Sequence, residues 1–113
     1  MSAYKGYKEA IFAACQLSME SSGSTNGEIN IGSLTDVATG KWKVNFANAI
    51  VGLGSNVPYT VTVGTKNDNS DNGWFIGIAA RTSTYVEVHS WRHGVGYHDL
   101  DNISIQCVLG DQS

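Results

Sequence analysis

The chain has 113 residues, of which 42% are hydrophobic and 15% are charged, and its formal net charge is −3. This length suits one domain with a single core, and the lack of any run of Lys or Arg argues against nucleic acid as a partner. No apolar stretch approaches the roughly 20 residues that cross a bilayer, so we expect no membrane insertion. The 13 glycines and single proline, with many Ser, Thr and Asn, indicate short strands joined by turns.

The first predicted strand runs from Lys8 to Met19. Residues 1–7 are expected to be a linker or lead-in, and residues 8–113 to form a single β-sandwich domain. The strand is predicted because side chains of opposite faces alternate: Ile11, Ala13, Cys15 and Leu17 against Phe12, Ala14, Gln16 and Ser18. Residues 9–14 also favour a helix locally. We prefer the strand because the rest of the chain is β and needs pairing partners. Residues 21–27 are predicted to be a loop from their composition.

A β-hairpin is predicted between residues 29 and 47. Residues 29–37 and 41–47 are its strands, and Ala38-Thr39-Gly40 is the turn, in which Gly40 supplies a positive φ angle. In the second strand large apolar side chains alternate with polar ones. The predicted core residues are Trp42, Val44 and Phe46. Lys41 and Lys43 are expected on the opposite face, in solvent or at a subunit interface.

Four more strands are predicted, at residues 59–63, 74–80, 84–91 and 103–109. The segments predicted as loops or turns are 50–57, 67–73, 81–83 and 93–99. Pro58 directly precedes the first of these strands, where proline is tolerated. The 74–80 strand is apolar enough to be buried on both faces, with Trp74 in the core or, alternatively, lining a pocket at the end of the sandwich. About seven or eight strands predict an all-β fold, an antiparallel β-sandwich or jelly roll.

Cys15 and Cys107 are the two cysteines of the chain, and both lie in strand-like runs near its opposite ends. The favoured interpretation is two buried thiols. A disulfide that joins the first and last strands is the alternative. Their separation does not fit a zinc motif.

Several segments, taken in order, carry a resemblance to a known family. They are Thr35-Asp36-Val37-Ala38-Thr39-Gly40 leading into Lys41-Trp42-Lys43-Val44-Asn45-Phe46, then Ala47-Asn48-Ala49, Pro58-Tyr59-Thr60-Val61, Ser83-Thr84-Tyr85-Val86-Glu87-Val88 and Asp101-Asn102-Ile103-Ser104-Ile105-Gln106-Cys107-Val108-Leu109-Gly110. Over roughly residues 8–110 the chain resembles the C-terminal receptor-binding domain of bacteriophage tail fibres, which is similar in architecture to H-type lectins. Residues 91–97 have no template in that family, so a site there is inferred from its residues alone.

The resemblance implies a small H-type-lectin-like β-sandwich that forms a homotrimer and binds host surface polysaccharide or lipopolysaccharide. It also implies a place in the virion, as part of a tail fibre assembled in the host cytoplasm. The start of the chain, Met1-Ser2-Ala3-Tyr4-Lys5, lacks the apolar core of a signal peptide, in agreement with that expectation. Two alternatives stay open: a trimerisation or capping domain without its own ligand site, and a lectin module unrelated to phages.

The segment Ser90–Asp99 is the best candidate for a ligand site. Sugar recognition needs flat rings that stack on a pyranose, polar groups that bond its hydroxyls, and glycines that allow a close backbone approach. The candidate ligand-binding residues are Trp91, Arg92, His93, Tyr97, His98 and Asp99. In the alternative interpretation the aromatic side chains pack over an open end of the sandwich and the charges face water.

Metal binding and catalysis are not predicted. His89, His93 and His98 with Asp99 and Asp101 match no metal-ligand spacing, although a histidine near a three-fold axis would be present three times in a trimer. Residues 68–73 resemble the first half of a calcium loop, but Ala79 stands where the loop needs Glu. His89 and Ser90 are adjacent in a strand and face opposite sides, so they cannot form a nucleophile–base pair. We therefore expect no enzyme activity and no cofactor.

Overall fold

The computed structural model describes residues 11–50, 59–65 and 73–109. Within these ranges the chain forms nine strands and no helix. The strands are β1 (Ile11–Ser18), β2 (Ser24–Ile29), β3 (Ile31–Ala38), β4 (Lys41–Phe46), β5 (Tyr59–Thr65), β6 (Trp74–Arg81), β7 (Tyr85–Arg92), β8 (Gly96–Tyr97) and β9 (Ile103–Leu109). None of the described residues belongs to a helix long and apolar enough to cross a membrane.

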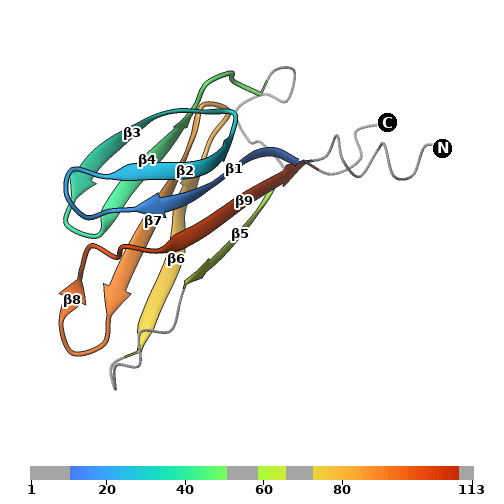
Figure 1. The fold of residues 1–113 in the computed structure, drawn as a ribbon. Helices are drawn as coiled ribbons and strands as arrows, with labels where there is room; N and C mark the ends of the chain where they lie inside the picture. Colours follow the sequence, from blue (N-terminus) through green and yellow to red (C-terminus); the bar gives the residue numbers. More distant parts are fainter. Residues whose placement is uncertain (1–10, 51–58, 66–72, 110–113) are drawn as a thin grey trace.

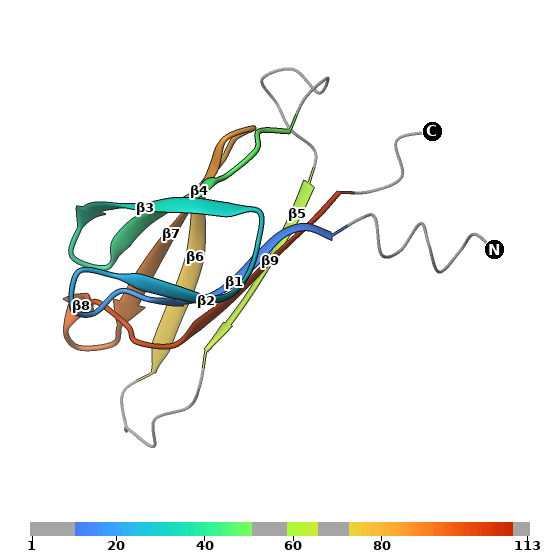
Figure 2. The ribbon, with the colours of Figure 1, turned by 45° about the horizontal axis from the view of Figure 1, so that its top comes forward.

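Two antiparallel sheets pack face to face (Figures 1 and 2). Sheet A has the strand order β2-β1-β9-β5. Sheet B has the order β3-β4-β7-β6, and β8 also pairs with β7. The chain passes from sheet A to sheet B at Asn30, a single residue with φ 57° between β2 and β3. The predicted all-β antiparallel sandwich is confirmed, with more strands than the seven or eight expected.

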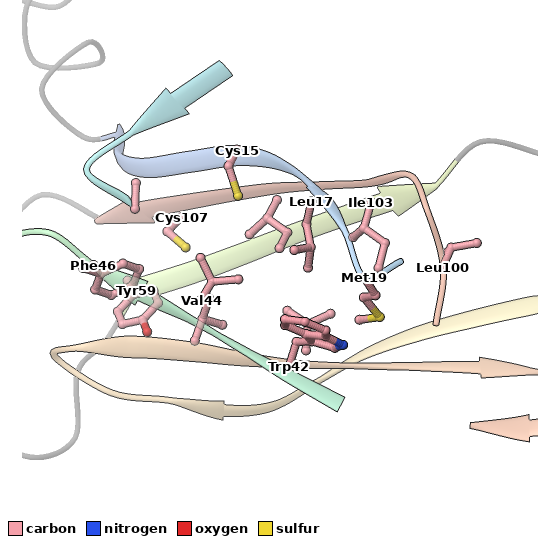
Figure 3. Close-up of a cluster of buried hydrophobic side chains, with 14 residues drawn as sticks. Cys15, Leu17, Met19, Trp42, Val44, Phe46, Tyr59, Leu100, Ile103 and Cys107 are labelled. Atoms are coloured by element: carbon pink, nitrogen blue, oxygen red, sulfur yellow. The ribbon is translucent and has the colours of Figure 1, made fainter. Parts of the chain in front are cut away.

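The core lies between the two sheets (Figure 3). Alternate residues of β1, β4 and β9 point inward, as their period of two predicts. The buried apolar side chains are Ala13, Cys15, Leu17, Met19, Trp42, Val44, Phe46, Tyr59, Val86, Val88, Leu100, Ile103, Ile105 and Cys107. The prediction of Trp42, Val44 and Phe46 as core residues is therefore confirmed. Trp74 is partly buried and packs against this core from its edge.

The β3–β4 hairpin turns at Thr39 and Gly40, as predicted. Gly40 has φ 71°, and a Cβ atom at this position would lie 2.6 Å from the backbone oxygen of Ser90 and 2.6 Å from the backbone nitrogen of His98. Any side chain would therefore clash with rigid backbone as well as strain the turn. This close approach joins the hairpin to the segment that carries the candidate site.

Three predictions about elements are wrong. Residues 21–27 were expected to be a loop, but β2 begins at Ser24 and pairs with β1. Nearly all of β2 is exposed, because an edge strand held by backbone hydrogen bonds needs no apolar side chains. The 74–80 strand is not buried on both faces: it alternates between half-buried and exposed positions, since the sandwich covers only one of its faces. The predicted 93–99 loop contains the short strand β8.

Cys15 and Cys107 are buried free thiols, as predicted. They lie on neighbouring strands, but Cys15 is opposite Ile105 and Cys107 is opposite Ala13, so the two cysteines are diagonal to each other. Burial raises the pKa of Cys15 to about 11 and that of Cys107 to about 12. Such thiols are poor nucleophiles at neutral pH.

Candidate functional site

Three exposed aromatic side chains form a row across the outer face of sheet B. Phe75 on β6 is opposite Trp91 on β7, and Trp91 is opposite Tyr97 on β8. Their exposed fractions are 60%, 42% and 44%. We call these three residues the aromatic row. The neighbouring residue Ser90 is fully buried, so the pleat of β7 fixes Trp91 on the outside.

The aromatic row has a defined geometry. The Trp91 and Tyr97 rings are 4.9 Å apart between centroids and meet edge to face, at 85°. This arrangement is one of the two that aromatic pairs prefer. The edge-to-face arrangement leaves ring surface exposed on both residues, and paired strands carry both of them.

A second row lies directly beside the aromatic row. It consists of Gly77 on β6, His89 on β7 and Lys41 on β4, which are opposite one another in register. The His89 ring contacts the Tyr97 ring edge to face at 5.7 Å, and the Lys41 Nζ lies 4.2 Å from the Tyr97 ring centroid. Tyr97 is thus held by three neighbours, although β8 is only two residues long.

Charged groups continue along the same face. Glu87 Oε2 lies 2.7 Å from His89 Nε2, and its side chain is 17% exposed. Lys43 is opposite Glu87, and its Nζ lies 4.5 Å from the Tyr85 ring centroid. Both lysines were expected on this face, and the structure places each ammonium over a tyrosine ring, which is a favourable cation–π position.

Gly77 leaves open space in the second row. It is exposed, and a Cβ atom at this position would have no heavy atom within 4 Å. The space is bordered by Phe75 along β6 and by His89 across the strand pair. The outer face therefore has room for a ligand group next to its exposed aromatic rings.

The six predicted site residues do not share one face. Trp91 and Tyr97 lie in the aromatic row, whereas Arg92 and His98 lie against Trp74, which borders the core. The Arg92 guanidinium carbon is 5.4 Å from the Trp74 ring centroid, and the His98 ring is 5.4 Å from the same ring. Successive side chains of β7 point to opposite faces of the sheet, so the adjacent residues Trp91 and Arg92 lie on different faces.

Asp99 has a role in the fold of the hairpin. Its Oδ1 accepts hydrogen bonds from the Gly40 backbone N–H at 2.7 Å and from the Trp42 Nε1 at 3.2 Å. His93 is exposed in the β7–β8 turn, and its backbone N–H donates to the Gly73 carbonyl. That Arg92, His93, His98 and Asp99 bind a ligand stays a prediction, but the structure groups none of them with the aromatic row.

Sequence reasoning missed Phe75, Gly77 and Lys41 as parts of the face that carries Trp91 and Tyr97. Each is exposed or half-buried in an alternating strand, and that pattern was visible. What brings them together is the register between β6, β7 and β4, which depends on strand pairs far apart in the sequence.

Metal-binding and nucleophilic groups are not gathered in the part of the chain that the structure describes. No group of three or more His, Cys, Asp or Glu residues there could hold a metal ion. The Ser90 side chain is buried while His89 contacts Tyr97 on the outer face. The segment 68–72, considered as half of a calcium loop, and the predicted 51–57 loop lie outside the described residues.

A hollow of about 420 Å³ lies over the outer face of sheet A. Its lining includes Gln16, Thr62, Gly64, Ser104 and Gln106 from β1, β5 and β9. Gln16 Nε2 donates to Ser104 Oγ at 2.9 Å. The residues that line this hollow include no charged and no aromatic side chain.

Comparisons with protein-family models, curated proteins and solved structures find no match for this chain. The fold and the site define its class: a small antiparallel β-sandwich that presents an exposed aromatic row on one outer face, next to the exposed glycine Gly77.

Proposed function

We propose that this domain is the distal domain of a phage tail fibre and binds host surface polysaccharide or lipopolysaccharide. The observation that carries the proposal is the aromatic row, three large rings at 42–60% exposure in register across three strands. Clustered exposed apolar side chains on a small protein mark an interaction site. The binding is non-covalent adhesion, and no chemical step is required.

The surroundings of the aromatic row favour a saccharide as its ligand. A pyranose offers an apolar C–H face to an aromatic ring and a rim of hydroxyl groups to polar side chains. Here Trp91 and Phe75 lie beside the row that contains His89, and the Lys41 ammonium lies over the Tyr97 ring. Paired strands hold these groups, so little ordering is needed on binding.

Attachment through several copies would strengthen weak binding at each site. We propose a homotrimer located in the virion, in which three linked sites act together through their effective concentration. The outer face of sheet A is the candidate subunit contact, because the outward side chains Gln16, Thr62, Ser104 and Gln106 are uncharged. Depletion of charge is a feature of interface centres. This face also supports the second candidate function, a trimerisation or capping domain.

Adsorption to host cells and binding to purified surface polysaccharide test the proposal. We expect Trp91→Ala and Tyr97→Ala to remove most binding while unfolding at nearly the wild-type denaturant concentration, because both side chains are on the surface. Tyr85→Ala is the matched control: it removes an aromatic ring at the far end of the same strand and is expected to keep binding. Unchanged adsorption of folded Trp91→Ala protein would contradict the proposal, as would a wild type that binds no saccharide.

The proposed homotrimer is tested separately by sedimentation. A monomer at high protein concentration would contradict the trimer.

A further inference from the structure

The outer face of sheet B differs in charge from the chain as a whole. The chain has 7 basic and 10 acidic residues. On this face, the described charged side chains beside the aromatic row are two lysines, Lys41 and Lys43, and one glutamate, Glu87. The Glu87 carboxylate is mostly covered and already contacts His89 Nε2 at 2.7 Å. An arriving ligand therefore meets ammonium groups more readily than a carboxylate.

The two ammonium groups each lie over a tyrosine ring. Lys41 Nζ sits 4.2 Å over the Tyr97 ring and Lys43 Nζ sits 4.5 Å over the Tyr85 ring. A cation–π contact uses the ring face and leaves the N–H donors of the ammonium able to point at an anion. Of the two, Lys41 is adjacent to the aromatic row through Tyr97, whereas Lys43 lies two residues further along β4.

We propose that this site selects saccharides that carry a carboxylate, such as uronic acids. The inference rests on the proposed function and names its ligand class. The sugar ring occupies the open space over Gly77, against Trp91 and Phe75, and its carboxylate contacts the Lys41 ammonium. His89 forms the floor between them, held by Glu87.

An array of neutral and acidic bacterial surface polysaccharides tests the proposed selection of carboxylates. Each acidic member is also present in a reduced form, in which its carboxylates have become primary alcohols. We expect wild-type protein to bind acidic members and to lose about tenfold or more in affinity on reduction, the size of one charge-assisted hydrogen bond. Equal binding to the reduced forms, or binding to neutral members alone, would overturn the charge selection and leave the proposed function standing. Binding to no member would overturn both.

Two variants locate the selecting cation. Lys41→Gln is expected to lower affinity for an acidic member about tenfold and to lower affinity for its reduced form much less. Lys43→Gln, the matched control, is expected to change either affinity less than about twofold. Circular dichroism checks that both variants fold. If the two variants lose affinity equally, or if Lys41→Gln weakens acidic and reduced forms alike, Lys41 is not the contact for the carboxylate.

Discussion

Neighbouring residues of one short segment have different tasks in this domain. Trp91 points to the outer face, while Arg92 stacks near Trp74 at the edge of the core. The sequence predicted that the segment is rich in side chains that suit sugar binding, and it placed them in one loop. Since part of that loop is strand, the period of two applies and divides the cluster between two faces.

The contribution of the single residue Asp99 to stability can be tested by substitution. Asp99→Ala leaves the Gly40 N–H and the buried Trp42 N–H without their acceptor, so we expect the free energy of unfolding to fall by about 2 kcal/mol. Asp99→Asn keeps an oxygen at the accepting position and is expected to lose much less. Urea unfolding of both variants measures the difference. Equal stability of Asp99→Ala and wild type would show that these two hydrogen bonds do not secure the hairpin.

At the level of elements, the sequence predicted strands best where a buried face is paired with a polar one. The 41–47 strand and its Gly40 turn are confirmed because Trp42, Val44 and Phe46 alternate clearly. β2 could not be predicted, because an exposed edge strand has the composition of a loop. The degree of burial of β6 was overestimated, because apolar content alone does not tell whether a second layer covers a strand.

The aromatic row could likewise be predicted only in part from the sequence. Its members come from β6, β7 and β8, and they meet because of the register between strands. Trp91 and Tyr97 could be selected as candidate ligand-binding residues from the composition of their segment. Phe75 and Gly77 were not predictable as their neighbours, since a shift of one residue in register would move them to the opposite face.

For the whole molecule, the buried protonated groups of the core predict a loss of stability at alkaline pH. Burial raises the pKa of Cys15 to about 11, and that of Cys107 and of Tyr59 to about 12. Each group is neutral when protonated, and its pKa is higher in the folded chain than the unfolded values of 9.0 for Cys and 10.0 for Tyr. The folded state therefore keeps protons that the unfolded state loses.

We expect these groups to leave the free energy of unfolding unchanged below pH 9.0, the unfolded thiol value, and to lower it as the pH rises toward about 12. The slope is roughly 1.4 kcal/mol per pH unit for each group between its two pKa values. Urea unfolding at a series of pH values measures it. A variant with Cys15→Ala and Cys107→Ala is expected to show a shallower decline. A wild type whose stability stays constant or rises over this range would contradict the prediction.

The proposal that the outer face of sheet B binds the ligand can be tested by filling space. Gly77 on this face and Gly64 on the outer face of sheet A are both exposed strand residues, and a Cβ atom at either would meet nothing within 4 Å. Valine suits a strand at both positions, so both variants are expected to fold as stably as wild type. The two substitutions therefore differ mainly in which outer face receives the added side chain.

The most direct measurement is the affinity of a single site in Gly77→Val and in Gly64→Val, each compared with wild type, for a short fragment of the surface polysaccharide that only one site can hold, because this affinity does not depend on the linkage of sites in a trimer. We expect Gly77→Val to lose binding, because its side chain occupies the space beside Trp91 and Phe75, and Gly64→Val to bind as wild type does. Full binding by folded Gly77→Val protein, or loss of binding by Gly64→Val alone, would contradict a ligand site on sheet B.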